Sequence, residues 1–197
     1  MAGEQVPDGV LDIIFRKARS HAVFEPDSVS DVQLHAIYEL MKCAPTTANS
    51  QPQRILFLRS AEAKQRLAPA LSSINRDKTL AAPVTALFAY DLKFPDLLPR
   101  LYHNPDARKW YTRTPEHTEQ SAFRNATIQA AFFIVAARIV GLDCGPMSGF
   151  DNAKVDAEFF PDGHIKSNFL CNLGKGDPRK LPPDNPRLAF DEVCKII

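Results

Sequence analysis

The sequence predicts a single α+β domain in which helices flank a mixed β-sheet. Short apolar runs, which read as strands, alternate along the chain with stretches of helical periodicity, and this alternation favours an α/β or α+β layer. One helical stretch, residues 116–140, is longer than the others and should form a central helix. The chain has 197 residues, of which 45% are hydrophobic, so we expect one ordinary globular domain over residues 1–197.

The N-terminal part predicts two helices, at residues 8–19 and 31–43. The second opens with Ser30 and Gln33, a capping box in which each side chain satisfies a free backbone N–H. Pro45 should end this helix, because proline cannot continue one. The apolar residues that should face the core from it are Leu34, Ile37, Leu40 and Met41.

Further along, Ser60 should cap a helix that extends to about Leu71. The long helix at residues 116–140 contains many alanines, which permit close packing, and Gly141 fits its C-terminal cap. The apolar residues that mark its periodicity are Phe123, Ile128, Ala131, Val135 and Ile139. After a turn at residues 145–150, Asp151 should begin a short helix.

Three apolar runs predict buried strands, at residues 54–58, 83–90 and 169–173. Residues 95–115 form a loop-rich stretch, and insertions of this kind often shape substrate pockets. Residues 178–188 form a proline-rich tail.

The charge balance excludes several classes of protein. Lys and Arg number 24 against 23 Asp and Glu, so the chain lacks the basic excess that binds nucleic acid or an acidic membrane surface. Its longest apolar run, residues 130–137, is too short to span a bilayer. The four cysteines form no Cys-x-x-Cys pair and no hydrophobic signal segment opens the chain, so we expect a cytoplasmic protein.

Two common kinds of site are also not expected. The five histidines are widely separated and show no spacing typical of metal ligands, so we expect no metal ion. Ser148 stands beside a glycine but lacks the Gly-x-Ser-x-Gly spacing of a nucleophile elbow, which disfavours a serine hydrolase.

Five separated clusters of small polar and basic residues are the candidates for function. They are residues 18–21 (Ala-Arg-Ser-His), 44–52 (Ala-Pro-Thr-Thr-Ala-Asn-Ser-Gln-Pro), 75–78 (Asn-Arg-Asp-Lys), 145–149 (Gly-Pro-Met-Ser-Gly) and 186–187 (Pro-Arg). Each cluster alone could be an ordinary loop. Together and in this order they resemble the segments that surround FMN in the nitroreductase family, over nearly the whole chain.

Two further stretches resemble one branch of that family, the branch that includes malonic semialdehyde reductases. They are Phe123-Arg-Asn-Ala and Gly145-Pro-Met-Ser-Gly-Phe-Asp. The resemblance implies the nitroreductase fold, a mixed sheet flanked by helices in an intertwined homodimer.

The resemblance also implies an FMN site, and FMN needs cations for its phosphate, apolar faces for its flat ring and a few polar contacts at the ring edge. Arg19 and Arg187 are the best candidates for the phosphate, because a guanidinium offers paired donors to phosphate oxygens. Ser20 and His21 lie beside the first of them. The family usually carries further basic residues where this chain has Ala18 and Ala22, and His21 or Lys180 could compensate.

The ring would lie against two other clusters. Asn75 and Lys78 match a step that in relatives addresses the pyrimidine edge and the ribityl chain, where a cation would stabilise negative charge on reduced flavin. The turn expected along the ring edge contains Pro146, Met147, Ser148 and Gly149. A backbone N–H of Ser148 or Gly149 could there bond N5 of the flavin, although relatives often have an acidic residue in place of the serine.

The resemblance implies a homodimer with two shared active sites. The segment that relatives contribute from the other subunit is matched here by Pro45, Thr46, Thr47 and Asn49. The proline-rich C-terminus would embrace the partner.

The implied activity is that of an oxidoreductase. NADH or NADPH would give a hydride to N5 of FMN and then leave, so that a small-molecule acceptor could take its place in ping-pong kinetics. No side chain is assigned as a catalytic group. The acceptor implied by the closest branch is malonic semialdehyde, reduced to 3-hydroxypropionate, and its carboxylate could bind Arg100, Arg108 or Lys109; nitroaromatics and quinones are other acceptors.

Two other classes of function stay open at this point. One is a non-catalytic flavin-binding or flavin-delivery protein, which the same FMN contacts would suit. The other is a structural or protein-interaction domain in which the polar clusters are only loops. The sequence does not distinguish NADH from NADPH, because it contains no recognisable ribose-reading motif. It does not distinguish one acceptor from another either.

Overall fold

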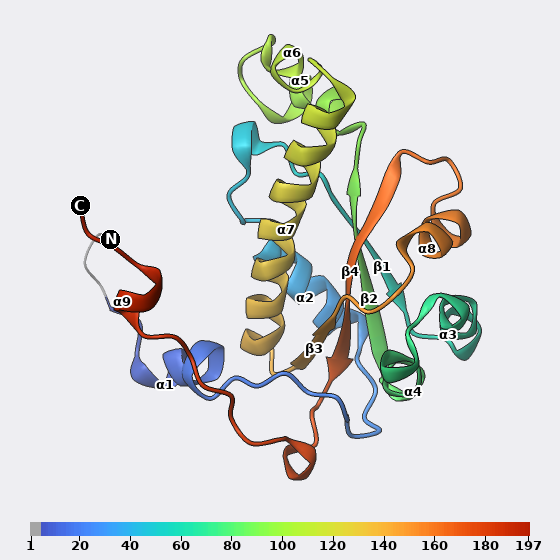
Figure 1. The fold of residues 1–197 in the computed structure, drawn as a ribbon, viewed down its shortest axis with the longest axis vertical. Coiled ribbons are helices and arrows are strands. Elements are labelled where there is room, and N and C mark those ends of the chain that lie inside the picture. The colour runs from blue at the N-terminus through green and yellow to red at the C-terminus, as the bar shows by residue number, and fades with distance from the viewer. Residues whose placement is uncertain (1–4) are drawn as a thin grey trace.

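The computed structural model describes residues 5–197 and is built around one four-stranded sheet (Figure 1). The strands are β1 (Gln53–Leu58), β2 (Val84–Asp91), β3 (Asp143–Met147) and β4 (Ile165–Gly174). They pair in the order β1-β2-β4-β3, and each pair is antiparallel. The sheet is therefore antiparallel, whereas a mixed sheet was predicted. The parallel pairing within the described chain is an isolated bridge between Ser20 and Cys144.

Strand β2 is buried along its whole length. Successive side chains of a strand point to opposite faces of the sheet. Val84, Ala86 and Phe88 accordingly belong to one buried cluster, and Leu87 and Ala89 to another. Helices must cover both faces of this strand, which is why its sequence is a continuous apolar run.

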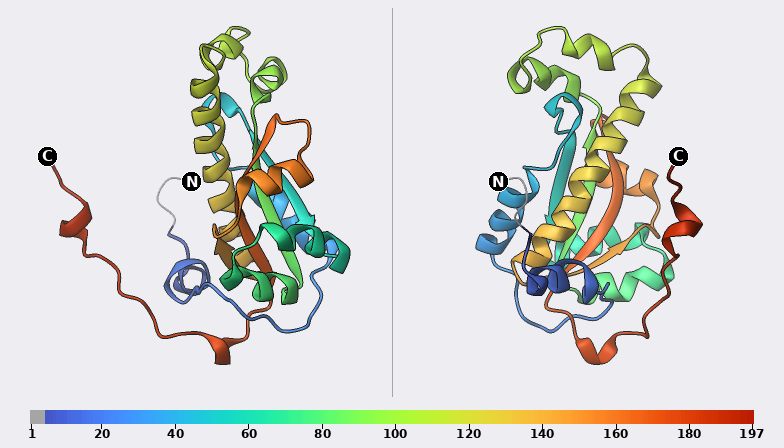
Figure 2. Two further views of the ribbon diagram at one scale, coloured as in Figure 1. Left: turned by 45° about the vertical axis from the view of Figure 1, so that its right-hand side comes forward. Right: turned by 90° about the vertical axis from the view of Figure 1, so that its left-hand side faces the viewer.

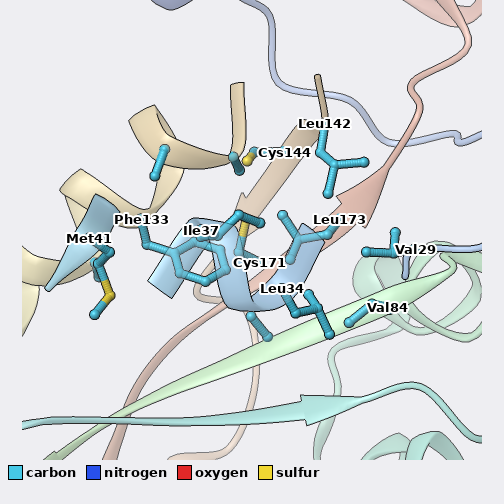
Figure 3. Close-up of a cluster of buried hydrophobic side chains, with 14 of the residues drawn as sticks. Val29, Leu34, Ile37, Met41, Val84, Phe133, Leu142, Cys144, Cys171 and Leu173 are labelled. Atoms are coloured by element: carbon cyan, nitrogen blue, oxygen red, sulfur yellow. The ribbon is translucent and has the colours of Figure 1, made fainter. Parts of the chain in front are cut away.

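One face of the sheet is covered by the helices α2 (Asp31–Met41) and α7 (Pro115–Ile139) (Figure 1). The capping box predicted at Ser30 and Gln33 is confirmed. Helix α2 ends at Met41, before the predicted end at residue 43. Three of the four predicted core residues are buried, and Figure 3 shows them packed against Phe133 and Leu173, whereas Leu40 is 43% exposed.

Helix α7 is the predicted central helix. Thr114 caps its start by accepting a hydrogen bond from the His117 backbone N–H, and Gly141 follows its end with a φ of 81°. Its buried side is mostly alanine and packs closely on the sheet, through Ala122, Ala126, Ala130, Phe133, Ala136 and Ala137. The residues that marked its periodicity in the sequence lie mainly outside: Phe123, Ile128, Ala131 and Ile139 are exposed, and Val135 is half-buried.

The other face is covered by α3 (Ala61–Leu67), α4 (Ser73–Ala81) and α8 (Asn152–Phe159). Ser60 caps α3 as predicted, but a 3₁₀ turn at Ala68–Ala70 replaces the last predicted turn. Helix α4 was not predicted. Asp151 caps α8 as expected, by accepting a hydrogen bond from the Lys154 backbone N–H.

The stretch predicted as loop-rich is largely helical. It contains a 3₁₀ turn at Phe94–Leu97 and the short helices α5 (Leu98–Leu101) and α6 (Ala107–Tyr111). Its buried side chains pack with Ala122 and Ala126 of α7. The insertion is therefore anchored to the N-terminal half of that helix.

The N-terminal segment packs beside the end of α7, where Ile14 is buried, and the C-terminal tail leaves the core. Helix α1 (Asp8–Leu11) continues as a π-helical turn at Asp12–Arg16, so the predicted helix over residues 8–19 stops early. After a 3₁₀ turn at Pro178–Lys180, the tail runs away from the body and carries the short α9 (Phe190–Val193) (Figure 2). None of the helices in the described part of the chain is long and apolar enough to cross a membrane.

We expect Ser30→Ala to lower the free energy of unfolding by about 1 kcal/mol, because it removes the side chain that accepts from the Gln33 backbone N–H. Urea denaturation measures this difference. Ser28→Ala, at an exposed position just before the helix, is the matched control and should leave the midpoint unchanged. Equal midpoints for both variants would contradict the capping argument.

Candidate functional site

The turn after β3 is clamped to the start of α4. The Gly149 carbonyl oxygen accepts hydrogen bonds from the Ser72 backbone N–H at 3.0 Å and from Asn75 Nδ2 at 2.9 Å. A Cβ atom at position 149 would lie 2.5 Å from Asn75 Nδ2, so this approach requires glycine. The structure thus places Asn75 and Gly149 side by side.

The turn itself is shorter than the sequence indicated. Pro146 and Met147 belong to strand β3, so the turn begins at Ser148 and not at residue 145. Met147 is buried, and its sulfur accepts a hydrogen bond from Thr79 of α4 at 3.4 Å. Ser148 is exposed.

Helix α4 presents an amide and an ammonium group on one side. Asn75 and Lys78 are three positions apart, so their side chains lie on neighbouring parts of the helix surface. Asn172 of β4 donates from Nδ2 to the Lys78 carbonyl oxygen at 3.3 Å and accepts from Thr85 Oγ at 2.7 Å, which ties the helix to the sheet. The Lys78 ammonium forms no ion pair with any residue from 5 to 197.

A buried lysine fixes the far end of α4. Lys64 Nζ donates to the carbonyl oxygens of Leu80 and Ala82, which the helix itself leaves without partners. Burial lowers the pKa of this ammonium. The position of α4, and with it that of Asn75, is therefore set from both ends.

The segment at residues 19–21 runs beside strand β3 and approaches it closely at a glycine. The His21 backbone N–H donates to the Cys144 carbonyl oxygen at 2.9 Å, next to the bridge between Ser20 and Cys144. A Cβ atom at position 145 would lie 2.3 Å from the His21 carbonyl oxygen. Gly145 therefore permits this close approach.

The His21 side chain points into the protein. It is 8% exposed, its ring packs directly on Gly176, and its Nε2 lies 3.7 Å from Asp143 Oδ1. The other oxygen of Asp143 accepts from the Gly176 backbone N–H at 2.8 Å. Through these contacts His21 holds residues 19–21 against the body of the protein.

Arg19 holds the C-terminal tail. Its Nη1 pairs with Asp184 at 2.9 Å, and its Nη2 donates to the Pro182 carbonyl oxygen at 2.6 Å. Arg187 is exposed and donates only to backbone oxygens of its own neighbours in the described chain, and Lys180 is exposed as well. The structure does not bring Arg187 to Arg19, and a phosphate at Arg19 would compete with Asp184.

The loop before β1 has a strained backbone. Ala48, Asn49 and Gln51 have φ values of 51°, 50° and 42°, in the left-handed region that costs a residue with a side chain roughly 1 kcal/mol or more. Gln51 stabilises the loop by donating from its backbone to Thr46 Oγ at 3.3 Å and from Nε2 to Asn49 Oδ1 at 2.9 Å. Such strain persists where neighbours enforce it, and it concentrates at functional sites.

Two buried amides on α7 enforce this conformation. Asn125 Oδ1 accepts from the Thr47 backbone N–H at 2.8 Å, and Gln129 Oε1 accepts from the Gln53 backbone N–H at 3.2 Å. Neither role was predicted from the sequence, although Asn125 belongs to the Phe123-Arg-Asn-Ala stretch. Their signal was present, because Ser121, Asn125 and Gln129 repeat at four-residue spacing on the buried side of the helix.

An ion pair and the insertion hold the loop from the other side. Arg54 Nη2 pairs with Asp91 at 2.6 Å, while its Nη1 donates to the Gln51 carbonyl oxygen at 3.2 Å. Asn49 Nδ2 donates to the Leu101 carbonyl oxygen of α5 at 3.0 Å. The loop, the insertion and the N-terminal half of α7 therefore form one connected region.

The candidate residues fall into two groups at the two edges of the sheet. The turn group adjoins the edge strand β3 and comprises Arg19, Ser20, His21, Asn75, Lys78, Pro146, Met147, Ser148 and Gly149; Met147 is level with Leu87, at the middle of β2. The loop group precedes the other edge strand, β1, and comprises Pro45, Thr46, Thr47 and Asn49; the Asp91 backbone N–H donates to the Pro52 carbonyl oxygen at 2.9 Å. The strand order β1-β2-β4-β3 puts three strand spacings, roughly 14 Å, between the two edges of one chain.

No thiol or metal cluster adds to either group. A hydrogen bond from the Cys144 side chain, together with burial, raises the pKa of the Cys171 thiol well above its usual value, so it stays protonated and unreactive. Within residues 5–197, the His, Cys, Asp and Glu side chains form no group of three that could hold a metal ion.

Comparison with known proteins identifies the family. A family model described as the nitroreductase family matches residues 15–175. Two relatives carry the name “Putative NADH dehydrogenase/NAD(P)H nitroreductase”: one from Rhodopseudomonas palustris is 51% identical over 98% of both chains. The other, from Ralstonia nicotianae, is 48% identical over 95% of this chain and 96% of its own.

The fold also matches that of a solved nitroreductase structure. A solved structure from Exiguobacterium sibiricum, described as a nitroreductase in complex with FMN, is 19% identical to this chain. It matches with a TM-score of 0.87 over 98% of this chain and 99% of its own. The chain belongs to the nitroreductase family of oxidoreductases, and its α+β fold is the nitroreductase fold.

We expect Gly149→Ala to lower the free energy of unfolding by roughly 1–3 kcal/mol, because the new methyl group would overlap the Asn75 amide and force the turn away from α4. Thermal or urea denaturation measures the loss. Gly9→Ala is the control, since a Cβ there meets nothing within 4 Å. The close-approach argument fails if both variants are as stable as the unchanged chain.

Proposed function

We propose that the chain binds FMN and oxidises NADH or NADPH. The observation that carries this proposal is the contact between Asn75 and Gly149, which places an amide, the nearby Lys78 ammonium and a glycine turn together at one edge of the sheet. The family match and the FMN complex of the Exiguobacterium protein support it. When bound, FMN supplies the transfer of a hydride from the nicotinamide to an acceptor.

The donor and acceptor groups of the turn group fit such a ligand. The Gly149 backbone N–H makes no hydrogen bond to another described residue, and Asn75 Oδ1 has no partner there either, so a donor and an acceptor remain for a ligand. The Lys78 ammonium favours negative charge on a bound ring. Arg19 and Ser20, with His21 beneath them, would hold the phosphate, and Arg187 would join them if the tail moved toward the body.

A spectrum tests this proposal directly. We expect purified protein reconstituted with FMN to be yellow, with about one flavin per chain, and to bleach when NADH or NADPH is added without oxygen. A colourless protein would reject the FMN site. A yellow protein that neither nicotinamide bleaches would instead be a flavin-binding or flavin-delivery protein.

We propose malonic semialdehyde as the acceptor, with 3-hydroxypropionate as the product. The resemblance of Phe123-Arg-Asn-Ala and of the turn after β3 to malonic semialdehyde reductases supports this choice. The insertion supports a small substrate, because its helices α5 and α6 are packed against α7 and connected to the loop group through Asn49.

We expect the enzyme to reduce malonic semialdehyde with a higher kcat/KM than it reduces a nitroaromatic or a quinone. Steady-state rates with NADH and with NADPH, at one enzyme concentration, measure this ranking. If malonic semialdehyde is inert while the other acceptors turn over, the aldehyde assignment is wrong and the flavin reductase assignment remains.

We propose further that the protein works as a homodimer, because the turn group of one subunit needs the loop group of another. Large apolar side chains are exposed on the described chain, and exposed apolar patches are typical of interfaces. They include Ile13, Phe15, Phe132, Ile139, Leu188, Phe190, Ile196 and Ile197. A hollow of about 750 Å³ between α2 and the open edge of β1 offers the tail of a partner a place to bind.

Mixing of inactive variants tests the shared site. Asn75→Leu disables the turn group, and Ala48→Ile disables the loop group, because a β-branched residue does not tolerate a φ of 51°. We expect each variant alone to be inactive. A mixed dimer carries both changes in one site and neither in the other, so it should regain about half of the normal activity.

The control is a mixture of Asn75→Leu with Lys78→Leu, two changes in the turn group. This mixture should stay inactive, because every site then carries one defect. Sedimentation velocity should show dimers in all samples. An active monomer, or a mixed dimer of the first kind as inactive as its parents, would exclude subunit sharing.

A further inference from the structure

The outer side of α7 carries one charge without a partner. From Gln120 to Ile139 the helix has only two charged residues, Arg124 and Arg138. Arg138 is partly buried and donates from Nη1 to the Ile14 carbonyl oxygen at 2.7 Å. Arg124 is exposed and makes neither an ion pair nor a side-chain hydrogen bond with any residue that the structure describes.

Arg124 lies in a groove that contains no other charge. The groove has a volume of about 590 Å³ and is lined by Gln120, Phe123, Arg124, Thr127, Ile128 and Ala131. No acidic side chain lines it. A guanidinium in such surroundings is available to an anion from outside the chain. Burying this guanidinium without an anion would carry a desolvation penalty.

The groove lies on the same half of α7 as a residue that holds the loop group. That residue is Asn125, which follows Arg124 in the sequence and accepts from the Thr47 backbone N–H. The same half of α7 packs with the insertion through Ala122 and Ala126. If the loop group completes a partner's flavin site, the groove lies at the border of that site.

The insertion cations singled out from the sequence are mostly neutralised. Arg108 Nε pairs with Asp96 at 2.9 Å, and Lys109 Nζ pairs with Asp106 at 2.6 Å. Arg100 has no ion pair in the described chain, but it lines neither the hollow beside α2 nor the groove on α7. The groove on α7 is therefore the better place for a substrate carboxylate.

We propose that Arg124 binds the carboxylate of the acceptor and makes the enzyme select small aldehyde acids over neutral acceptors. This inference rests on the proposed function of the same site. A guanidinium can hold both carboxylate oxygens at once, which a lysine ammonium cannot do with the same geometry. Phe123 and Ile128 provide apolar contact for the short carbon chain.

The experiment compares Arg124→Gln and Arg124→Lys with the unchanged holoenzyme. For malonic semialdehyde, kcat/KM should fall by about 10- to 100-fold in Arg124→Gln, mainly through KM, and recover in part in Arg124→Lys. For a neutral aldehyde and for a quinone, kcat/KM should stay within about twofold of its value in the unchanged enzyme. Arg108→Gln is the matched control, because Arg108 already has Asp96 as its partner. This variant should change kcat/KM for neither the acid nor the neutral acceptors.

An inhibition arm separates this inference from the choice of substrate. 3-Hydroxypropionate should inhibit quinone reduction by the unchanged enzyme and lose that effect in Arg124→Gln. If malonic semialdehyde is not turned over but this pattern holds, the proposed substrate is wrong and the carboxylate site stands. If Arg124→Gln leaves both selectivity and inhibition unchanged, or if Arg100→Gln causes the loss instead, Arg124 is not the carboxylate site.

A third outcome concerns the dimer. Sedimentation of Arg124→Gln should show the same oligomer as the unchanged protein. If the variant dissociates and loses turnover of neutral acceptors to the same degree as that of the acid, Arg124 pairs with the partner subunit. That result would overturn the proposal.

Discussion

The burial of β2 on both faces is the constraint on which the rest of the structure depends. A strand that is covered on both faces presents no functional groups itself, so these groups lie along the edges of the sheet. The turn after β3 lies at one edge, and the loop before β1 lies at the other. The width of the sheet keeps the two groups apart within a chain, and this separation is the structural reason for proposing a shared site in a dimer.

The two groups are held in different ways. In the turn group, close packing of backbone segments fixes the geometry. Gly145 and Gly149 let neighbouring segments come nearer than a Cβ atom would allow. At the loop group, buried amides on α7 and the ion pair between Arg54 and Asp91 maintain a strained backbone. Both arrangements produce rigid sites, since either the backbone or its hydrogen-bond partners would have to move for the site to change shape.

Ion pairing within the chain decides which cations are available to ligands. Arg108 and Lys109 looked equally suitable in the sequence, but acidic neighbours already neutralise them. Lys78 and Arg124 have no such neighbour in the described chain, and each faces a region that other observations connect with the site. Arg19 is an intermediate case, because its partner Asp184 belongs to a tail that leaves the body of the protein.

The sequence by itself determined the local features of this protein. The capping box of α2, the glycine after α7 and the apolar runs of β1, β2 and β4 were predictable, because each depends on residues within a few positions of one another. The family was also visible, because its clusters keep their order along the chain.

Only the tertiary structure decided the antiparallel pairing, the side of α7 that is buried and the conformation of residues 73–81 as helix α4. It also decided that Asn125 and Gln129 hold the loop, and that the candidate residues form two groups. These features depend on contacts between segments far apart in the sequence, where packing and the need to satisfy buried polar groups outweigh local preference.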